Sequence, residues 1–249
     1  NGQTILITGS MYTEGEDPRG ILTAQDITQQ KRLESTRQKF VANVSHELKT
    51  PITFIRSMFE TLLSAKEKNI DLSIELIQKG VDHTDRLNQI IDDLLQLSKL
   101  ETTGGEIEKE PANLQGIVDI VMQQCQDRAD NKQIQLISKS NDRNVLCNAN
   151  LLVQALKNLV ENAIKYSPEE TTVTMSNTET ASHIEIHVTD EGPGIEEKHI
   201  AKLFQRFYRI DNARSRQMGG TGLGLAIVKH IAQSHGGQST LKSTLKKGT

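Results

Sequence analysis

The stretch Ser45-His46-Glu47-Leu48-Lys49-Thr50-Pro51 places an imidazole, a carboxylate and a hydroxyl within two helical turns. Positions i and i+4 share one face of a helix, so the Thr50 hydroxyl is expected to approach any group that the His46 imidazole carries. Glu47 points about 100° away from His46, so its carboxylate reaches the Nδ1 proton only through a suitable rotamer. Pro51 lacks an N–H and its ring presses on the preceding turn, which predicts a kink beside His46. The alternative interpretation of this heptapeptide is an exposed helix with an incidental histidine and proline.

Apolar residues recur at helical spacing on both sides of this stretch. The first helix is predicted to begin at Thr28, and a polar break at residues 66–71 separates it from a second helix that contains Ile74 to Leu94. The apolar stripe of the first helix consists of Leu33, Phe40, Val44, Leu48, Ile55 and Leu62. Two antiparallel helices cannot shield two broad apolar faces by themselves, so we expect two chains to pair into a four-helix bundle.

The beginning of the chain differs from these helices. Residues 4–8 and 20–24 are predicted strands, separated by turn residues at 14–18. Two isolated strands do not make a stable sheet. The passage from Gly20 to Thr28 resembles the end of a PAS sensory domain where that domain continues into a signalling helix. Most of such a domain is then expected upstream.

Composition narrows the class of protein. The chain has 249 residues, a net charge of -3 and 24% charged residues, which is typical of a globular protein with two modules. Aromatic residues make up 3%, so aliphatic side chains are expected to fill the core. The absence of a long basic block argues against nucleic acid as the main partner. No run approaches the roughly 18 apolar residues of a membrane span, so no membrane insertion by this stretch is expected. Cys125 and Cys147 provide no disulfide framework.

A second module is predicted after the helix-breaking segment Thr102-Thr103-Gly104-Gly105. Helices are expected at residues 114–128 and 151–166, and strands at residues 106–110, 133–138, 171–176 and 183–189. This mixture predicts an α/β sandwich with one helical layer.

Within the predicted helix 151–166, Asn158, Asn162 and Lys165 share one face. Amide oxygens beside a cation suit a magnesium-bound triphosphate, because Mg²⁺ keeps several waters and phosphate oxygens as ligands. The alternative is a solvated face on which Glu161 and Lys165 form an ordinary ion pair.

The segment Asp190-Glu191-Gly192-Pro193-Gly194 directly follows a predicted strand. A carboxylate at this position can accept a hydrogen bond from an exocyclic amine such as that of adenine, and it would repel the carbonyl of guanine. Many turns contain such a pattern, so this motif by itself is weak.

The glycine loop Gly219-Gly220-Thr221-Gly222-Leu223-Gly224 precedes a predicted apolar-striped helix. Glycines let backbone N–H groups approach phosphates closely, and the helix N-terminus adds partial positive charge. The loop lacks the Lys-Ser/Thr of a Walker motif, and no strand leads directly into it as a dinucleotide fingerprint requires.

Together with the segment Phe204-Gln205-Arg206-Phe207-Tyr208-Arg209, these motifs in this order resemble the sensor histidine kinases of bacterial two-component systems, over roughly residues 29–247. The sequence of residues 40–51 is similar to the corresponding segment of phosphate-regulon sensors and of cell-wall sensors. The resemblance implies a multidomain α and α+β protein. Residues 1–28 would be the remnant of a PAS-like domain. Residues 29–103 would form the dimerisation and histidine phosphotransfer hairpin, and residues 104–249 a Bergerat-type ATP-binding domain.

The resemblance also implies catalytic roles. His46 would take the γ-phosphoryl group of ATP, and Glu47 would orient or accept its Nδ1 proton. Arg209 would contact the γ-phosphate during transfer. An aspartate of the receiver domain of a partner response regulator would then accept the phosphoryl group, and Thr50 would position water when the kinase dephosphorylates that regulator.

The nucleotide contacts follow in the same way. Asn162, with Asn158, would bind Mg²⁺, Lys165 and Tyr166 would contact the nucleotide, and Asp190 would bind the adenine amine. The pocket and its lid would be shaped by Gly192, Gly194, Gly220, Gly222, Leu223 and Gly224, whereas Arg214 and Arg216 would be solvated lid charges. The resemblance further implies a homodimer on the cytoplasmic side of the bacterial membrane, in a protein anchored upstream.

Two other function classes stay open from the sequence. The ATP module also resembles that of gyrase and mismatch-repair ATPases, although those lack a box like that around His46. The other function class is a dimeric scaffold that binds nucleotide without phosphoryl transfer. The family pattern adds one strand after Lys247-Gly248-Thr249, expected to pair near residues 237–243, and its absence here is expected to weaken the module.

Overall fold

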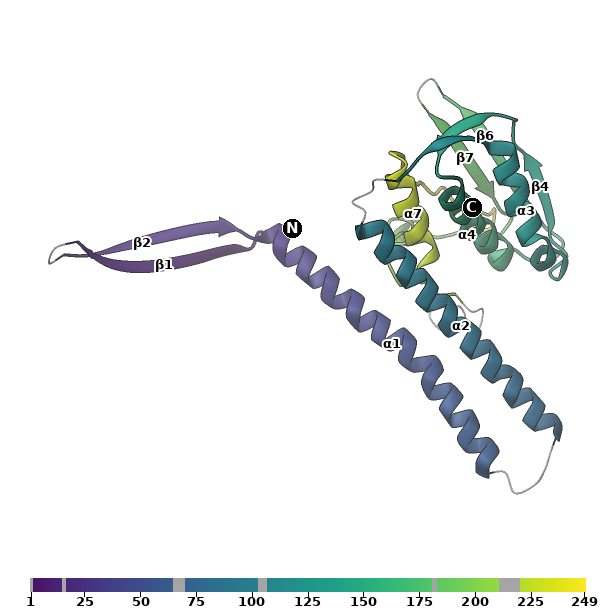
Figure 1. Ribbon diagram of the computed structural model, residues 1–249, viewed down its shortest axis with the longest axis horizontal. Helices are drawn as coiled ribbons and strands as arrows, with labels where there is room; N and C mark the ends of the chain where they lie inside the picture. The colour runs from purple at the N-terminus through teal and green to yellow at the C-terminus, as the bar shows by residue number, and fades with distance from the viewer. Residues whose placement is uncertain (1, 15–16, 65–69, 103–106, 181–182, 211–219) are drawn as a thin grey trace. The chain divides into compact units, whose positions relative to one another are not determined.

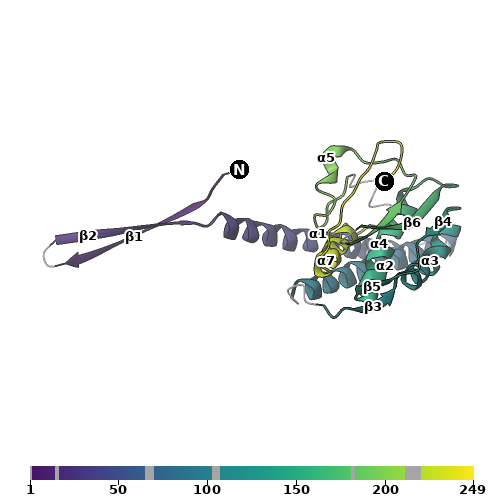
Figure 2. The ribbon, with the colours of Figure 1, turned by 90° about the horizontal axis from the view of Figure 1, so that it is seen from above.

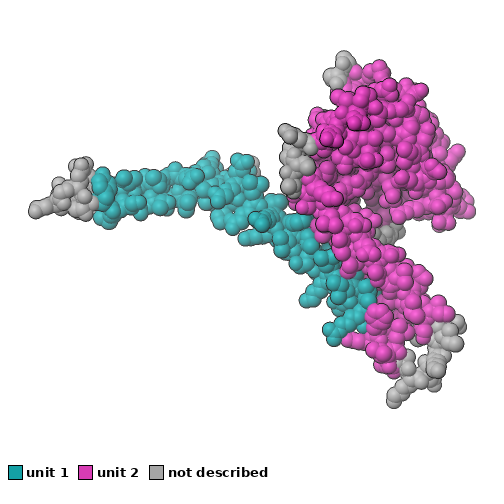
Figure 3. Space-filling model, in the orientation of Figure 1, with its two compact units in different colours: residues 1–57 teal, residues 58–249 magenta. Residues whose placement is uncertain are grey.

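The computed structural model describes residues 2–14, 17–64, 70–102, 107–180, 183–210 and 220–249 (Figure 1). Contacts within the chain divide it into two compact units, residues 1–57 and residues 58–249 (Figure 3). The first unit contains a β-hairpin and most of a long helix. The second contains the end of that helix, a second long helix and an α/β module.

The hairpin of the first unit consists of β1 (Ile5–Glu14) and β2 (Asp17–Asp26), which pair antiparallel and lead into α1 (Thr28–Ser64) (Figure 2). The carboxylate of Asp26 accepts a hydrogen bond from the Thr28 N–H at 2.8 Å, and the Thr28 hydroxyl accepts one from the Thr4 N–H at 2.8 Å. These bonds satisfy backbone donors at the predicted helix start. Both predicted strands exist and are longer than predicted, while part of the predicted turn at 14–18 lies outside the described residues.

Helix α1 continues through Pro51 as a single element. Proline removes only the hydrogen bond that the Glu47 carbonyl would accept, so a long helix tolerates it when neighbouring turns are intact. Directly before Pro51, the Thr50 hydroxyl donates to the His46 carbonyl oxygen at 3.0 Å. The first helix is therefore confirmed, and the kink at Pro51 stays a prediction.

In the second unit, α2 (Ile70–Thr102) has two apolar faces. The buried side chains Ile90, Leu97 and Leu100 recur at steps of three and seven residues, as one helix face requires. Among the side chains of this helix that the structure describes, the exposed large apolar ones are Ile74, Ile77, Val81, Ile91 and Leu95. The predicted second helix is confirmed, and most of the predicted polar break at 66–71 lies outside the described residues.

The α/β module has a mixed three-stranded sheet in the order β4 (Gln135–Lys139), β6 (Thr172–Glu179) and β7 (Ile184–Thr189). Strand β6 is parallel to β4 and antiparallel to β7. A separate pair consists of β3 (Glu110–Asn113) and β5 (Asn144–Cys147). The helices are α3 (Leu114–Asp130), α4 (Ala149–Tyr166), the short α5 (Glu197–Ile200) and α7 (Gly224–Ser234).

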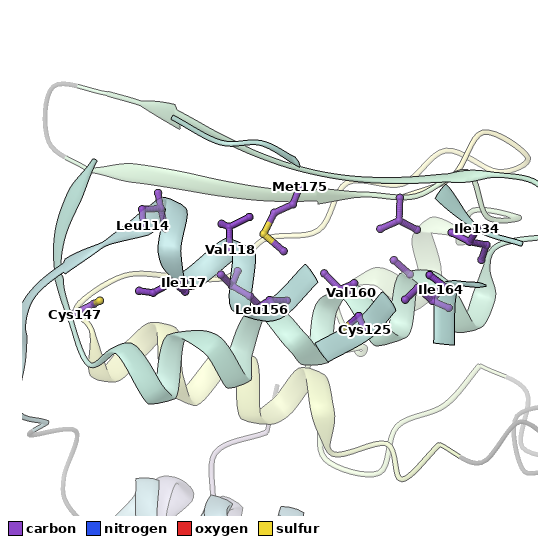
Figure 4. Close-up of a cluster of buried hydrophobic side chains, with 14 residues drawn as sticks. Leu114, Ile117, Val118, Cys125, Ile134, Cys147, Leu156, Val160, Ile164 and Met175 are labelled. Carbon is purple, nitrogen blue, oxygen red and sulfur yellow. The ribbon is translucent and has the colours of Figure 1, made fainter. Parts of the chain in front are cut away.

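The core of the module lies between α3, α4 and the sheet (Figure 4). Val118 on α3 and Val160 on α4 are fully buried, as is Met175 on β6. Both helices begin at an asparagine whose side chain accepts a backbone N–H, Asn113 for α3 and Asn148 for α4. The predicted sandwich with an aliphatic core is confirmed.

Three predicted strand positions were wrong. The first strand of the module spans residues 110–113 rather than 106–110, because it pairs with β5, which the sequence pattern did not reveal; Glu106 is outside the described residues. Gln133 has a φ of 55°, which places it in the turn that ends α3, so β4 begins only at Gln135. Residues 237–243, where the missing strand was expected to pair, contain no strand.

Candidate functional site

The glycine loop lies against polar side chains of α4. A Cβ built on Gly220 would be 2.5 Å from Lys165 Nζ and 3.8 Å from Arg209 Nη2. A Cβ built on Gly224 would be 3.6 Å from Asn158 Oδ1. A side chain at position 220 would displace the ammonium group of Lys165, so this loop position lies directly against that cation. The structure thus brings together five residues that the sequence predicted as parts of one site: Asn158, Lys165, Arg209, Gly220 and Gly224.

Positive charge is concentrated at this point. Burial, followed by the repulsion from Arg209 and more distant arginines, lowers the pKa of Lys165 to about 8. The ammonium group also lies 5.2 Å from the centre of the exposed Tyr166 ring. A half-buried lysine beside an arginine and a glycine loop is an arrangement that an anion would stabilise. Glu161, the predicted alternative partner of Lys165, instead lies 2.9 Å from Arg128 Nη1.

Asp190 is held by backbone donors at the end of β7. Its Oδ1 accepts hydrogen bonds from the Gly192 N–H at 2.8 Å and the Thr249 N–H at 3.2 Å. Burial raises the pKa of this carboxyl group, and the two backbone hydrogen bonds oppose the rise. Its Oδ2 makes no hydrogen bond within the part of the chain that the structure describes. The carboxylate is thus oriented with one oxygen left for a donor such as an amine.

The end of the chain packs against this loop. Gly194 has a φ of 70°, and a Cβ on it would be 2.1 Å from the Thr244 carbonyl oxygen. Gly248 has a φ of 102°, and a Cβ there would be 1.9 Å from the Asp190 carbonyl oxygen. Both positions exclude a side chain, so residues 244–249 form one wall of the Asp190 loop.

The base of the glycine loop is closed by the Phe207 segment. The Phe207 N–H donates to the Gly222 carbonyl at 2.8 Å, and a Cβ on Gly222 would be 2.9 Å from Phe207 Cα. Gly222 has a φ of 74°, and Phe207 has a φ of 61°, an uncommon conformation for a bulky residue. Leu223 is fully buried beside them. These contacts hold the loop against Phe207.

The predicted phosphoacceptor group lies in the first unit. His46 is exposed on α1, and Glu47 and Thr50 are half-buried on the same helix. The Thr50 hydroxyl is directed to the backbone carbonyl of His46 rather than to its imidazole. An exposed imidazole on a helix is accessible to a second molecule or module.

Asn162 is placed by α4, one turn after Asn158, and is half-buried. A magnesium ion fits this pair only together with phosphate, because two neutral amide oxygens supply no charge and leave most of an octahedron open. The buried Asn158 Nδ2 has no hydrogen-bond partner among the described residues, which also points to a polar ligand. Arg214 and Arg216 lie outside the described residues, as does Gly219.

The sequence did not indicate the contacts that α2 makes with this loop. Thr221 donates its hydroxyl hydrogen to Asp93 Oδ2 at 2.7 Å, and Glu101 contacts Arg206. No motif joins residues so far apart in the chain. The sequence could have indicated this contact only through the position of Asp93, a charged residue within an apolar face of the predicted helix; the structure shows that it is buried.

Two protein families match the chain. Residues 36–103 match the His Kinase A (phospho-acceptor) domain. Residues 147–249 match the histidine kinase-, DNA gyrase B-, and HSP90-like ATPases. The two matches contain, respectively, the His46 segment and the residues gathered around the glycine loop.

Relatives align with nearly the whole chain. Sensor histidine kinase WalK of Bacillus subtilis is 37% identical over 233 residues, which are 92% of this chain and 38% of that protein. Sensor-like histidine kinase SenX3 of Mycolicibacterium smegmatis is 39% identical over 242 residues, which are 96% of this chain and 63% of that protein. The chain therefore spans less than two thirds of the length of these relatives.

Solved structures share the fold. Histidine kinase AdeS of Acinetobacter baumannii matches with a TM-score of 0.66 and 25% identity, covering 82% of this chain and 93% of that one. Histidine kinase ThkA in complex with response regulator protein TrrA matches with a TM-score of 0.65 and 21% identity, covering 93% of this chain and 72% of that one.

Among the described helices, none has the length and apolar character needed to cross a membrane.

Proposed function

The chain belongs to the sensor histidine kinases of bacterial two-component systems, and from that premise we propose that it transfers the γ-phosphoryl group of ATP to His46. In this reaction His46 Nε2 forms a bond to the γ-phosphorus while the bond to the β,γ-bridging oxygen breaks and ADP leaves. Glu47 accepts or holds the Nδ1 proton of the imidazole. The phosphoryl group then passes to an aspartate of a response regulator.

One observation carries this proposal: Lys165 and Arg209 both lie at the glycine loop, where a Cβ on Gly220 would be 2.5 Å from Lys165 Nζ and 3.8 Å from Arg209 Nη2. Two cations beside a glycine-rich loop and the N-terminus of α7 form a site for phosphate groups. Lys165 would neutralise charge in the bound nucleotide, and Arg209 would stabilise charge that moves to the leaving oxygen during transfer.

The base of the nucleotide would bind at Asp190. Its Oδ1 is held by the Gly192 and Thr249 backbone, and Oδ2 remains to accept the adenine amine. Tyr166, exposed at the end of α4, would contact the nucleotide beside Lys165. Guanine offers a carbonyl at this position and would be disfavoured by the carboxylate.

Magnesium would be bound through the amide oxygens of Asn158 and Asn162. When bound, the ion would neutralise phosphate charge and hold the nucleotide in the orientation for transfer. The amides orient and complete its ligand shell, and their neutrality makes binding depend on the nucleotide.

Thr50 supports a second activity, removal of the phosphoryl group from the response regulator. Its hydroxyl donates to the His46 carbonyl, and its oxygen lone pairs can still accept a hydrogen bond from a water molecule. We expect this water, rather than the imidazole, to attack the phosphoaspartate.

We also propose a homodimer. Each long helix exposes large apolar side chains in the single chain, among them Leu33, Val41 and Phe54 on α1 and Ile74 and Ile77 on α2. A second copy of the chain would cover them in a four-helix bundle. The domains are proposed as a PAS-like remnant at residues 1–28, the phosphotransfer hairpin at 29–103 and the ATP-binding domain at 104–249. In the same proposal, the chain is part of a longer membrane-anchored sensor and works at the cytoplasmic side of the bacterial membrane.

The test is incubation of the chain with Mg²⁺ and γ-labelled ATP, beside His46→Gln. A matched control is His183→Gln, which replaces an exposed histidine on the hairpin before β7. We expect acid-labile, alkali-stable label on the wild type and on His183→Gln, and none on His46→Gln. Label that survives in His46→Gln would refute the assignment. Bound ATP without label would favour the scaffold, and label-free hydrolysis would favour the ATPase.

A further inference from the structure

A buried carboxylate of α2 contacts the glycine loop. Asp93 is 6% exposed, and its Oδ1 accepts a hydrogen bond from Gln89 Nε2 at 2.8 Å. Its Oδ2 accepts the hydroxyl hydrogen of Thr221 at 2.7 Å. Both oxygens are therefore engaged, which is how a buried carboxylate is normally satisfied.

Thr221 connects this carboxylate to the helix that follows the loop. The Thr221 side chain is buried, and its oxygen also accepts the Leu223 N–H at 3.2 Å, immediately before α7 begins at Gly224. The negative charge of Asp93 thus lies one hydroxyl group away from the N-terminus of α7, where the helix attracts anions. Phosphate groups of a nucleotide would use the same positive end.

Further contacts hold α2 on the module. Glu101 contacts the Arg206 guanidinium and lies 3.6 Å from His230 Nε2 on α7. Gln96 contacts Gln154 on α4. Helix α2 also packs against α7 (Figure 1). The helix is therefore attached at both its middle and its end, with Asp93 as the contact to the loop.

We propose that this docked arrangement is a resting state in which Asp93 competes with nucleotide phosphates for the glycine loop. The inference rests on the proposed function and concerns regulation of the same site. A carboxylate at an anion site repels a triphosphate, and while it is hydrogen-bonded to Thr221 it also fixes the conformation of the loop. Nucleotide binding and docking of α2 then weaken each other by the same factor.

Charge on the docked helix is not uniformly negative. Arg86, about two turns before Asp93, lies near enough to Lys165 to contribute to the lowering of its pKa. The carboxylate of Asp93 nevertheless bonds directly to the glycine loop through Thr221. Removing that charge separates its effect from the effect of the helix as a whole.

The first experiment measures binding of a non-hydrolysable ATP analogue with Mg²⁺ to the full chain by calorimetry. Asp93→Asn keeps the volume and a hydrogen-bond acceptor but removes the charge, and we expect its dissociation constant to fall roughly five- to tenfold. Asp92→Asn removes the same charge from the exposed neighbouring position and should bind like the wild type. Glu101→Gln, which weakens docking at the Arg206 contact rather than at Thr221, should also tighten binding.

A second measurement reports docking itself. The double variant Gln96→Cys/Gln154→Cys can be joined by a short bismaleimide, because native Cys125 and Cys147 are buried. We expect the cross-linking yield to fall when the ATP analogue is added, and to be lower when Asp93→Asn is also present.

The outcomes separate the two proposals. Equal dissociation constants for Asp93→Asn, Glu101→Gln and the wild type, with unchanged melting temperatures, would refute competition while leaving ATP binding intact. A cross-linking yield that does not respond to the analogue would also refute it. Failure of every variant and of the wild type to bind the analogue would refute the proposed function, and the competition with it.

Discussion

We predict that Lys165 makes nucleotide binding depend on pH in a range where few other groups titrate. Its pKa is lowered from 10.5 to about 8 by burial and by Arg209, so the charged form is lost as pH rises through 8. About three quarters of the Lys165 side chains carry a charge at pH 7.5 and about one tenth at pH 9. If the charged form binds phosphate and the bound nucleotide keeps it charged, the dissociation constant rises roughly eightfold between these pH values.

The assay is displacement of a fluorescent ADP from the His46→Gln variant, in which no phosphoryl transfer occurs, with excess Mg²⁺ between pH 7.5 and 9. The thiols do not interfere, because burial raises the pKa of Cys125 to about 11 and also raises that of Cys147. Lys165→Arg keeps its charge throughout this range and should give a flat profile. Lys157→Met, on the same helix, should keep the pH dependence.

A wild-type dissociation constant that stays the same from pH 7.5 to 9 would refute this reasoning. So would an equal slope in Lys165→Arg, because the titrating group would then be a different one.

Three further predictions concern the same module. Asp190→Asn removes the acceptor that we propose for the adenine amine. It should weaken ATP binding roughly 10- to 100-fold and reduce the preference for ATP over GTP, measured by competition. Gly222→Ala requires a side chain at a φ of 74° and 2.9 Å from Phe207 Cα, and should lower the free energy of unfolding by about 1–3 kcal/mol in urea titration. His235→Leu leaves the Asn148 N–H, now 3.0 Å from His235 Nε2, without its acceptor and should cost about 1–3 kcal/mol in the same titration.

Controls and refuting outcomes differ among these variants. Gly237→Ala places a Cβ in ordinary contact, 3.5 Å from its nearest neighbour, and should change stability little beside Gly222→Ala. Equal stability of the two glycine variants would refute the strain argument. Unchanged discrimination in Asp190→Asn would show that the base binds elsewhere. Wild-type stability of His235→Leu would mean that water replaces the imidazole.

Local patterns were sufficient for the helices. α3 and α4 were predicted to within two residues at each end, because an apolar stripe with helical spacing carries its own signal. The strands were harder to predict from the sequence. β3 is set by antiparallel pairing with β5, from Glu110 with Cys147 to Asn113 with Asn144, at separations of 37 to 31 residues. Neither short strand has a periodicity long enough to detect.

The candidate site was only partly predictable. Motifs identified Lys165, Asp190 and the glycines, since those residue types perform recognisable chemistry wherever they occur. They could not show that Thr249 donates to the Asp190 carboxylate, or that Thr50 donates to the backbone of His46 instead of facing its imidazole. A hydroxyl or a backbone N–H chooses among several acceptors, and the choice depends on packing that no spacing rule contains.

The sequence by itself determined which chemical groups this protein has and on which elements they lie: an imidazole on a long helix, amides and a lysine on one face of α4, and a glycine loop before α7. Those properties follow from side-chain chemistry and from helical and strand periodicity, which act over a few residues. The tertiary structure alone decided that Lys165 and Arg209 meet at Gly220, and that Asp93 bonds to Thr221 over a separation of 128 residues. Burial gives such distant contacts their strength, because a polar group withdrawn from water must find its partner inside the fold.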